Sequence, residues 1–290
     1  MDKLLVIGSA NPGLSTNMLL DEAKERFEVE YAPVNKILLE LNEKPRITYN
    51  GKDLSKFDYC LPRIDSKRAQ HGYHVIRFLD MLEMKKPYSA HTVLVAHNKF
   101  MSLEVLKKAD VSIPKTYLVG SLETAKSILR NMHYPIIIKI VGGFGGAGVM
   151  VFEDVDSALS AVQTLKLLKQ ELIIEEFISN PGEDVRAFVV NGEIVAGMKR
   201  IAKKDDVRAN LFLGGKAEYF VLSSEMKDVA LEAAAAINSD IIAIDLIDSK
   251  DGPKVIEVNL NPGLKGIQKA TGKNIAKTII DFVADEIREE

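Results

Sequence analysis

Polar side chains alternate along the stretch KVIEVNLNPGLKG near the end of the chain, where Glu257 and Asn259 stand two residues apart. Asn is depleted in strands, so its place in a strand-like segment suggests a function. The preceding apolar segment IIAIDLID carries Asp245, and the Asp-Gly pair after it predicts a hairpin turn. If the strands pair symmetrically about Asp251, Asp245 faces Glu257, and Asn259 follows on the same face.

Two directly opposed carboxylates repel each other unless a cation lies between them. Asp245 is flanked by Ile, Ala and Leu, where an unpaired carboxylate would be costly. The ligand set of Asp245, Glu257 and Asn259 contains only oxygen donors, which suits Mg²⁺ or Mn²⁺ holding nucleotide phosphates, and not zinc. The alternative is a solvated strand face with unrelated charges.

A glycine-rich stretch, GGFGGAG, follows Lys139 of the segment IIIKIV. It matches G-x-G-x-x-G, but a dinucleotide fold needs a helix next, and VMVFED reads as a strand. We interpret it as a flap between two strands whose backbone N–H groups approach phosphate oxygens. The alternative is an ordinary glycine-rich turn beside an exposed lysine.

Cationic side chains occupy the segment between the glycine stretch and the last hairpin: Arg186, Lys199, Arg200, Arg208 and Lys216. Taken singly, each is expected to be a surface charge. Taken together, they would form the positive half of a site that balances a triphosphate and carboxylates.

The order of expected elements gives an α/β lobe joined to α+β lobes. Residues 1–89 read as a βαβ lobe, residues 90–174 as a small lobe with the glycine flap, and residues 175–290 as a large lobe with the metal hairpin. Asn98 is the expected N-cap of a helix that begins at Lys99.

Composition narrows the class of protein. The 290 residues carry 38 Lys and Arg against 41 Asp and Glu, a net charge of −3, so no basic field indicates nucleic acid. The single cysteine, Cys60, suits a reducing compartment. We see no signal peptide and no apolar run long enough for a bilayer, and therefore expect a cytoplasmic protein without a membrane partner. Whether it forms a homo-oligomer is left open.

The motifs LPRI, IIEEFI, GEDVRAFVVNGEIVAGMKR, RANLFLGG, AIDLI and VIEVNLNPGLKGIQKATG, in this order, resemble the ATP-grasp carboxylate–amine ligases. Within that group the chain is most similar to the RimK-like glutamate ligases, from Leu61 to the C-terminus. The resemblance implies an ATP-grasp fold with an N-terminal Rossmann-like (pre-ATP-grasp) lobe and two α+β lobes that enclose ATP.

The resemblance also implies roles for individual residues. Lys99, Lys139 and the flap glycines Gly143, Gly145 and Gly146 would contact phosphates; Glu176 and Phe177 would hold adenine through their backbone; Asp184 would hold the ribose or adenosine; Arg208 and Asn210 would face the γ-phosphate and the reacting carboxylate; and Asp245, Glu257 and Asn259 would hold two Mg²⁺ or Mn²⁺ ions. One departure is Ala209, where the family often has Ser.

The implied reaction is ATP-dependent joining of an amino acid, L-glutamate first, to a carboxylate acceptor through an acyl phosphate, with release of ADP and phosphate. The acceptor would be a small coenzyme or a glutamate-ending protein tail. Three alternatives stay open: a LysX-like ligase acting on an amino-group carrier protein, a non-catalytic ATP-binding module, and a kinase-like transfer to a hydroxyl group.

A polar cluster follows the predicted strand that ends near Pro62, at a position where α/β proteins bind ligands. It contains Arg63, Lys67, Arg68, His71, Tyr73 and His74. We expect this cluster to bear on the choice of acceptor, with an anion as the ligand; the histidines are also compatible with ordinary surface positions.

Overall fold

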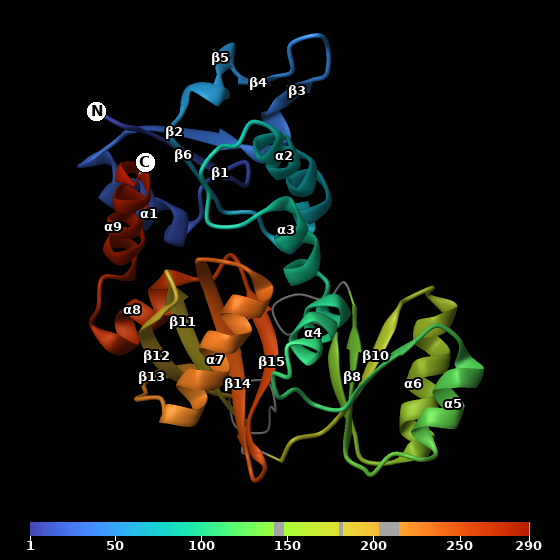
Figure 1. The fold of residues 1–290 in the computed structure, drawn as a ribbon. Helices are drawn as coiled ribbons and strands as arrows, with labels where there is room; N and C mark the ends of the chain where they lie inside the picture. The colour runs from blue at the N-terminus through green and yellow to red at the C-terminus, as the bar shows by residue number, and fades with distance from the viewer. Residues whose placement is uncertain (142–147, 180–181, 203–214, 290) are drawn as a thin grey trace.

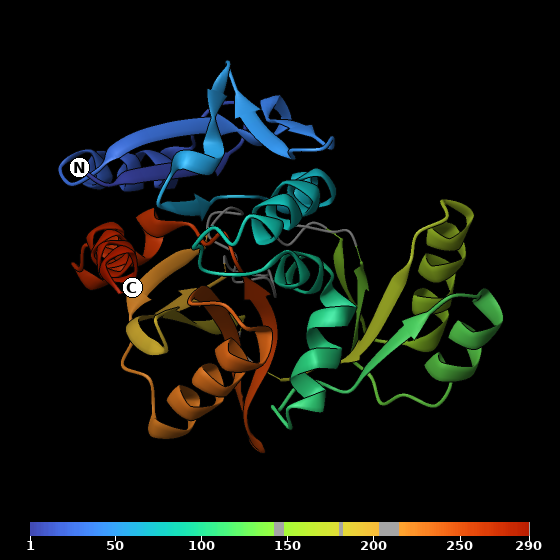
Figure 2. The same cartoon turned by 45° about the horizontal axis from the view of Figure 1, so that its top comes forward.

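Three lobes make up the described part of the chain, which is residues 1–141, 148–179, 182–202 and 215–289 of the computed structural model. In Figure 1 the N-terminal lobe lies above two lobes built on antiparallel sheets, with the larger lobe on the left. The two chain termini lie near each other because the last helix packs against the first, which Figure 2 also shows.

The N-terminal lobe has a parallel sheet of order β2-β1-β6 and a small sheet of order β3-β4-β5. Its elements are β1 (Lys3–Gly8), α1 (Leu14–Lys24), β2 (Glu28–Pro33), β3 (Leu38–Glu40), β4 (Arg46–Tyr49), β5 (Lys52–Asp53), β6 (Tyr59–Pro62) and α2 (Ala69–Met81). Strand alternation sends Leu4 and Val6 toward α1, and Leu5 and Ile7 toward α2. The predicted βαβ opening is therefore confirmed.

The small lobe is a four-stranded sheet of order β7-β10-β8-β9 covered by two helices. Its elements are β7 (Thr116–Val119), α5 (Leu122–Leu129), β8 (Ile136–Ile140), β9 (Val149–Phe152), α6 (Val155–Leu167) and β10 (Leu172–Glu176). Strands β8 and β9 pair antiparallel, with Lys139 opposite Val149. The segment after the glycine stretch is thus a strand and not a helix, as the sequence indicated.

The large lobe is a five-stranded antiparallel sheet of order β13-β12-β11-β14-β15. Its elements are β11 (Glu183–Val190), β12 (Glu193–Ile201), β13 (Lys216–Tyr219), α7 (Ser224–Ile237), β14 (Ile241–Ser249), β15 (Gly252–Asn259), α8 (Leu264–Thr271) and α9 (Ile275–Arg288). Helix α7 covers one face, while α8 and α9 cover half of the opposite face. The other half of that opposite face carries the charged residues of the candidate site.

The connection between the N-terminal and small lobes differs from the expectation. Helices α3 (Ala90–His97) and α4 (Lys99–Lys108) bury Val93, Leu103 and Leu106 in the core that also contains Ala230 of α7. These helices therefore pack with the N-terminal and large lobes, and not with the small lobe. The expected boundary after residue 174 also falls inside β10, which pairs with β7 and β8 along its length.

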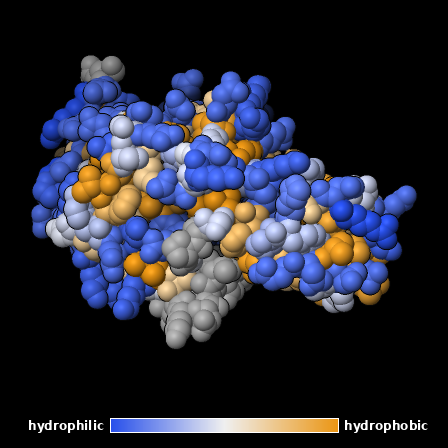
Figure 3. Space-filling view, turned by 90° about the horizontal axis from the view of Figure 1, so that it is seen from below, coloured by the Kyte–Doolittle hydropathy of each residue, from blue (hydrophilic) through white to orange (hydrophobic). Residues whose placement is uncertain are grey.

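The face of the molecule seen from below is mostly hydrophilic among the described residues (Figure 3). Seen from below in Figure 3, hydrophobic residues lie in separate small areas, and the small lobe extends to the right. Across the helices of the described ranges, none has both the length and the apolar character that crossing a membrane requires.

Candidate active site

Two strands at the edge of the five-stranded sheet bring the predicted metal ligands together. Asp245 of β14 pairs with Glu257 of β15, and Ala243 pairs with Asn259, so Asp245, Glu257 and Asn259 share one face. The predicted pairing of Asp245 with Glu257 is confirmed. The predicted symmetry about Asp251 is not, because Ser249 pairs with Gly252 and a bulge next to Asp245 then restores the register.

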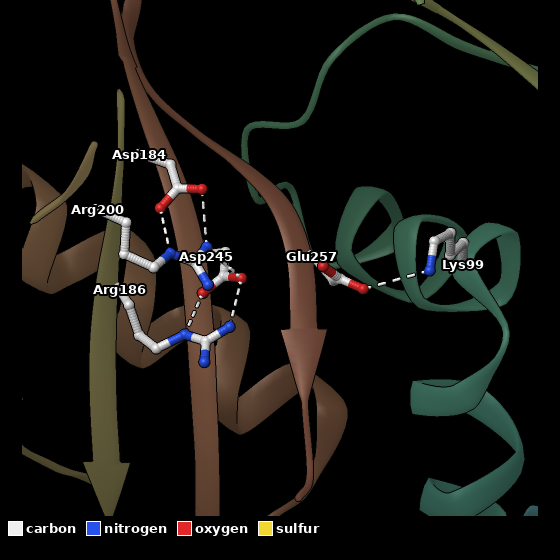
Figure 4. Close-up of polar contacts among 6 residues, drawn as sticks. All are labelled: Lys99, Asp184, Arg186, Arg200, Asp245 and Glu257. Atoms are coloured by element: carbon white, nitrogen blue, oxygen red, sulfur yellow. Dashed lines mark hydrogen bonds and ion pairs between the residues drawn. The ribbon is translucent and has the colours of Figure 1, made fainter. Parts of the chain in front are cut away.

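Asp245 is buried and held by two arginines. Its Oδ1 accepts from Arg186 Nε at 2.7 Å, and its Oδ2 accepts from Arg186 Nη2 and Arg200 Nη2, each at 2.7 Å. Burial by itself would raise the pKa of this carboxyl group, but the two guanidinium groups outweigh that effect and lower the pKa. Asp245 is therefore a fixed anion (Figure 4).

Asp184 completes this network from the neighbouring strand. It lies opposite Arg200 in the β11–β12 pair, and its Oδ2 accepts from Arg200 Nη2 at 2.8 Å. Burial raises the pKa of Asp184, and Arg200 only partly offsets that rise. Arg200 thus bridges two buried carboxylates (Figure 4).

The burial of the arginines corrects the sequence analysis. Taken singly, Arg186 and Arg200 were expected to be surface charges, and taken together to form the positive half of a site. They are 9% and 5% exposed, so the expectation of surface positions is wrong. Alternation along β11 already placed Asp184 and Arg186 on one face, which was the available signal. Because unpaired buried charges are costly, their burial follows from the matching of guanidinium and carboxylate geometry.

Glu257 has a different environment. Its side chain is 45% exposed, and its Oε1 lies 3.2 Å from Lys99 Nζ. Lys99 is the first residue of α4, and the side chain of Asn98 caps that helix by accepting from the N–H groups of Phe100 and Met101. The predicted N-cap is confirmed, and it fixes the helix end from which Lys99 reaches the sheet (Figure 4).

The donors on this face fit a hard divalent cation. Asp245 and Glu257 offer carboxylate oxygens and Asn259 an amide oxygen. Among the described residues, Oδ1 of Asp245 accepts one hydrogen bond, from Arg186 Nε, which leaves it a lone pair. Asn259 Oδ1 accepts from Asn261 N at 2.9 Å. Within the described residues no three His, Cys, Asp or Glu side chains form a metal-binding group, so such a site would depend on the amide of Asn259.

Lys139 lies in the small lobe and pairs with the carboxylate of Glu175 from the neighbouring strand β10. Its Nζ lies 2.5 Å from Oε2 of Glu175, and both side chains are largely buried. The other oxygen of Glu175, Oε1, is buried and has no hydrogen-bond partner within the described ranges. Lys139 is thus held close to Glu175, and a further polar group is needed to satisfy that oxygen.

The segment after β10 leads from the small lobe to the large lobe. Glu176 Oε1 accepts from Lys254 Nζ at 2.7 Å and from Lys115 N at 3.0 Å, and its own N–H donates to Lys115 O. The carboxylate of Glu176 therefore links β10 to β15. Phe177 follows directly and is partly buried. Gly143, Gly145, Gly146, Arg208 and Asn210 lie outside the described residues.

Comparison with known protein families identifies the family of this chain. Residues 96–283 match the RimK-like ATP-grasp domain, and residues 3–93 match the RimK PreATP-grasp domain. The chain belongs to the RimK-like ATP-grasp family. As a member of this family it is an ATP-dependent ligase.

Curated relatives of similar length support this assignment. A probable alpha-L-glutamate ligase of Vibrio vulnificus is 32% identical over 284 residues, which cover 96% of this chain and 94% of the relative. A protein of the same name from Methanococcoides burtonii is 30% identical over 285 residues, or 97% and 95% of the two chains.

Solved structures share the fold at lower sequence identity. The RimK domain ATP-grasp protein of Sphaerobacter thermophilus superposes with a TM-score of 0.74 at 20% identity, over 96% of this chain and 98% of the other. The ATP-grasp ligase PsnB, complexed with a minimal precursor, gives a TM-score of 0.77 at 17% identity, over 99% of both chains. The predicted ATP-grasp fold with its pre-ATP-grasp lobe is confirmed.

Proposed function

We propose that this ligase joins L-glutamate, through its amine, to a carboxylate acceptor, and that it releases ADP and phosphate. The observation that carries the proposal is the opposed pair Asp245 and Glu257, with Asn259 on the same face and arginines and a lysine around them. The relatives named probable alpha-L-glutamate ligases support glutamate as the amine substrate.

The chemistry follows from the weak electrophilicity of a carboxylate. Transfer of the γ-phosphoryl group of ATP would turn it into an acyl phosphate, which the amine attacks with loss of phosphate. Two anions must meet for the first step, so cationic groups around them stabilise the transition state. Mg²⁺ or Mn²⁺ ions held by Asp245, Glu257 and Asn259, two in our proposal, would supply further positive charge to the phosphates.

Each residue role inferred from the family remains part of the proposal. Lys99 and Lys139 would contact phosphates, the backbone near Glu176 and Phe177 would hold adenine, and Asp184 would hold the ribose. Since the N–H of Glu176 already donates to Lys115, adenine would have to use the other backbone groups of this segment. Arg208, Asn210 and the flap glycines keep their proposed roles near the γ-phosphate.

Lys99 and Lys139 differ in how readily each would exchange its carboxylate partner for a phosphate group of the nucleotide. Lys99 faces a half-exposed Glu257, and ion pairs of this kind contribute only about 0–1 kcal/mol. Lys139 faces the buried Glu175. We therefore infer that Lys99 changes partner when nucleotide binds, whereas Lys139 keeps Glu175 and uses its remaining donors.

The acceptor in this proposal is a small coenzyme or a glutamate-ending protein tail. The net charge of −3 gives little attraction to polyanionic or acidic surfaces, which favours a small acceptor. A carrier protein, as in LysX-like enzymes, is the alternative acceptor for the same ligase chemistry.

The test is to incubate the protein with ATP, Mg²⁺, L-glutamate and a cell metabolite extract. We expect a compound heavier by one glutamyl unit in the mass spectrum, together with ADP and phosphate release that depends on glutamate. Nucleotide binding without ADP release would indicate a non-catalytic module. A phosphorylated product formed without an amino acid would indicate a kinase.

A further inference from the structure

Among the described residues, a buried arginine at the end of the parallel sheet has no carboxylate partner. Arg63 follows β6 directly and is 5% exposed. Its Nη2 donates to the carbonyl oxygen of Pro262 at 2.8 Å, and its Nε is buried without a hydrogen-bond partner in the part of the chain that the structure describes. Burial lowers the pKa of Arg63 to about 10, because the charged guanidinium loses its contact with water.

The neighbouring carboxylate does not supply this anion. Asp65 pairs through its Oδ2 with Arg68, and its Oδ1 is buried without a hydrogen-bond partner among the described residues, so it is not bonded to Arg63. By contrast, Arg186 and Arg200 each bind two or more carboxylate oxygens. A buried guanidinium without such a partner is the arrangement expected of a binding site for an external anion.

The position of Arg63 is set by packing on both sides. Ile64 is buried against Gly72 of α2, where an added Cβ would lie only 2.6 Å from Ile64 Cγ2. The hydroxyl of Tyr88 donates to the carbonyl oxygen of Pro62 at 3.3 Å. The turn that carries Arg63 is therefore held between α2 and the segment before α3.

This turn faces the proposed metal strand. Pro262, which accepts the hydrogen bond from Arg63, lies three residues after Asn259, and three residues span at most about 10 Å. Arg63 also stands at the carboxyl end of a parallel sheet, where α/β folds bind ligands. An anion at Arg63 would thus lie beside the nucleotide phosphates on the side of the N-terminal lobe.

We propose that Arg63 binds a carboxylate of the acceptor, an inference that rests on the ligase function proposed above. A guanidinium stabilises a carboxylate as an anion, so we assign Arg63 to a carboxylate that anchors the acceptor and stays ionised, not to the one that is phosphorylated. The acceptor is then a dicarboxylic or glutamyl compound. Within the polar cluster after β6, Arg63 is the buried arginine, and no carboxylate of the described residues pairs with it.

The test is calorimetric titration of the full chain with glutarate and the uncharged glutaramide. We expect the wild type to bind glutarate and not glutaramide. Arg63→Gln should weaken binding of glutarate by about 10- to 100-fold, and Arg63→Lys should weaken it less. Arg77→Gln, which changes an exposed arginine of α2, should leave the affinity for glutarate unchanged.

Thermal unfolding separates this role from a structural one. If Arg63 serves only to tie the N-terminal lobe to Pro262, Arg63→Gln should lower the melting temperature and leave carboxylate binding intact. We expect the reverse, because removal of an uncompensated buried charge does not destabilise the fold. Equal binding of glutarate by wild type and Arg63→Gln, or no carboxylate binding by the wild type, would overturn the proposal.

Ligase assays distinguish a failure of the proposed role of Arg63 from a failure of the proposed ligase function. If the wild type forms ADP with glutamate and an acceptor while Arg63→Gln keeps the same KM for that acceptor, the role of Arg63 is wrong and the ligase function stands. If the wild type binds glutarate through Arg63 but forms no ADP with any acceptor, the proposed function fails and the carboxylate site stands.

Discussion

The charged face of the large lobe has two regions with opposite character. On the inner strands β11, β12 and β14, Asp184, Arg186, Arg200 and Asp245 are buried and joined by short ion pairs. At the edge strand β15, Glu257 is half exposed and meets Lys99 from α4. The charges of these six named residues balance: the anions are Asp184, Asp245 and Glu257, and the cations are Arg186, Arg200 and Lys99.

This difference indicates a division of labour. Buried, doubly bonded groups keep their geometry because releasing any of them leaves a charge without solvent. An exposed ion pair exchanges its partner at low cost. We infer that the inner region holds Asp245 in place, while the edge region, Glu257 and Lys99, is where nucleotide and metal exchange with protein contacts.

The largest expected effect is that of breaking the inner network. Arg200→Leu leaves Asp184 without its partner and Asp245 with one arginine, so we expect the free energy of unfolding to fall by about 3–5 kcal/mol. Urea unfolding measures this loss. The control is Lys277→Gln, which removes an exposed pair with Asp281 and should cost no more than about 1 kcal/mol. Equal losses in the two variants would show that burial does not distinguish the regions.

The next effect concerns the edge region and should appear in activity, not in stability. Glu257→Gln keeps the shape of the side chain but removes its charge. We expect ADP formation to fall by at least about 100-fold, because a charged ligand of the phosphates' counterions is lost. Urea unfolding should change by less than about 1 kcal/mol. Near-normal turnover in this variant would contradict the role assigned to Glu257.

The free energy of unfolding should depend on pH in the acid range because of the inner network. The folded-state pKa of Asp245 lies below its value in the unfolded chain, about 3.9, so its contribution is complete above about pH 4 and is lost as the pH falls toward 2. We expect a loss of about 2–3 kcal/mol over this window. Asp184 acts oppositely, since its pKa is raised and its protonation relieves a burial cost.

Urea midpoints between pH 6 and pH 2 measure this dependence. Arg186→Lys keeps the positive charge but loses the fork that holds both oxygens of Asp245. We expect its stability to decrease less steeply below pH 4 than that of the wild type. A parallel decrease would show that Asp245 does not govern this part of the curve.

The smallest expected effect tests how the edge region is positioned. Asn98→Ala removes the N-cap of α4 and should cost about 1 kcal/mol. Ser121→Ala removes the cap of α5 in the small lobe at a similar cost. Because Lys99 begins α4, we expect Asn98→Ala alone to slow ADP formation, by roughly 10- to 100-fold. Equal activity in the two variants would show that the N-cap of α4 does not position Lys99 for the reaction.

Most elements could be predicted from local pattern. The βαβ start, the strand after the glycine stretch and the Asn98 cap were all expected. The Asn191-Gly192 pair, a typical hairpin turn, has positive φ at both residues. Helix α3, helix α8 and the small β3-β4-β5 sheet were not expected. The first two are only eight residues long, and the strands of that sheet have two to four residues, so their periodicity is weak.

Bulges set the register of strand pairing in two hairpins of the large lobe, β11–β12 and β14–β15. From the turn alone, Asp184 would pair with Lys199, but a bulge after Phe188 brings Arg200 opposite it. A second bulge sets Asp245 opposite Glu257 although the turn is not centred on Asp251. A one-residue shift moves a side chain to the other face of the sheet, so such shifts decide which charges meet.

By itself, the amino-acid sequence determined the kinds of groups available and their spacing within each strand, because alternation and turn propensity are local properties. That was enough to indicate oxygen ligands, a glycine flap and the ATP-grasp resemblance. Only the tertiary structure decided that Arg186 and Arg200 are buried on Asp245, and that Arg63 is buried with the carbonyl oxygen of Pro262 as its acceptor. Burial and ion pairing depend on which segments pack together, and that is set by contacts between residues far apart in the chain.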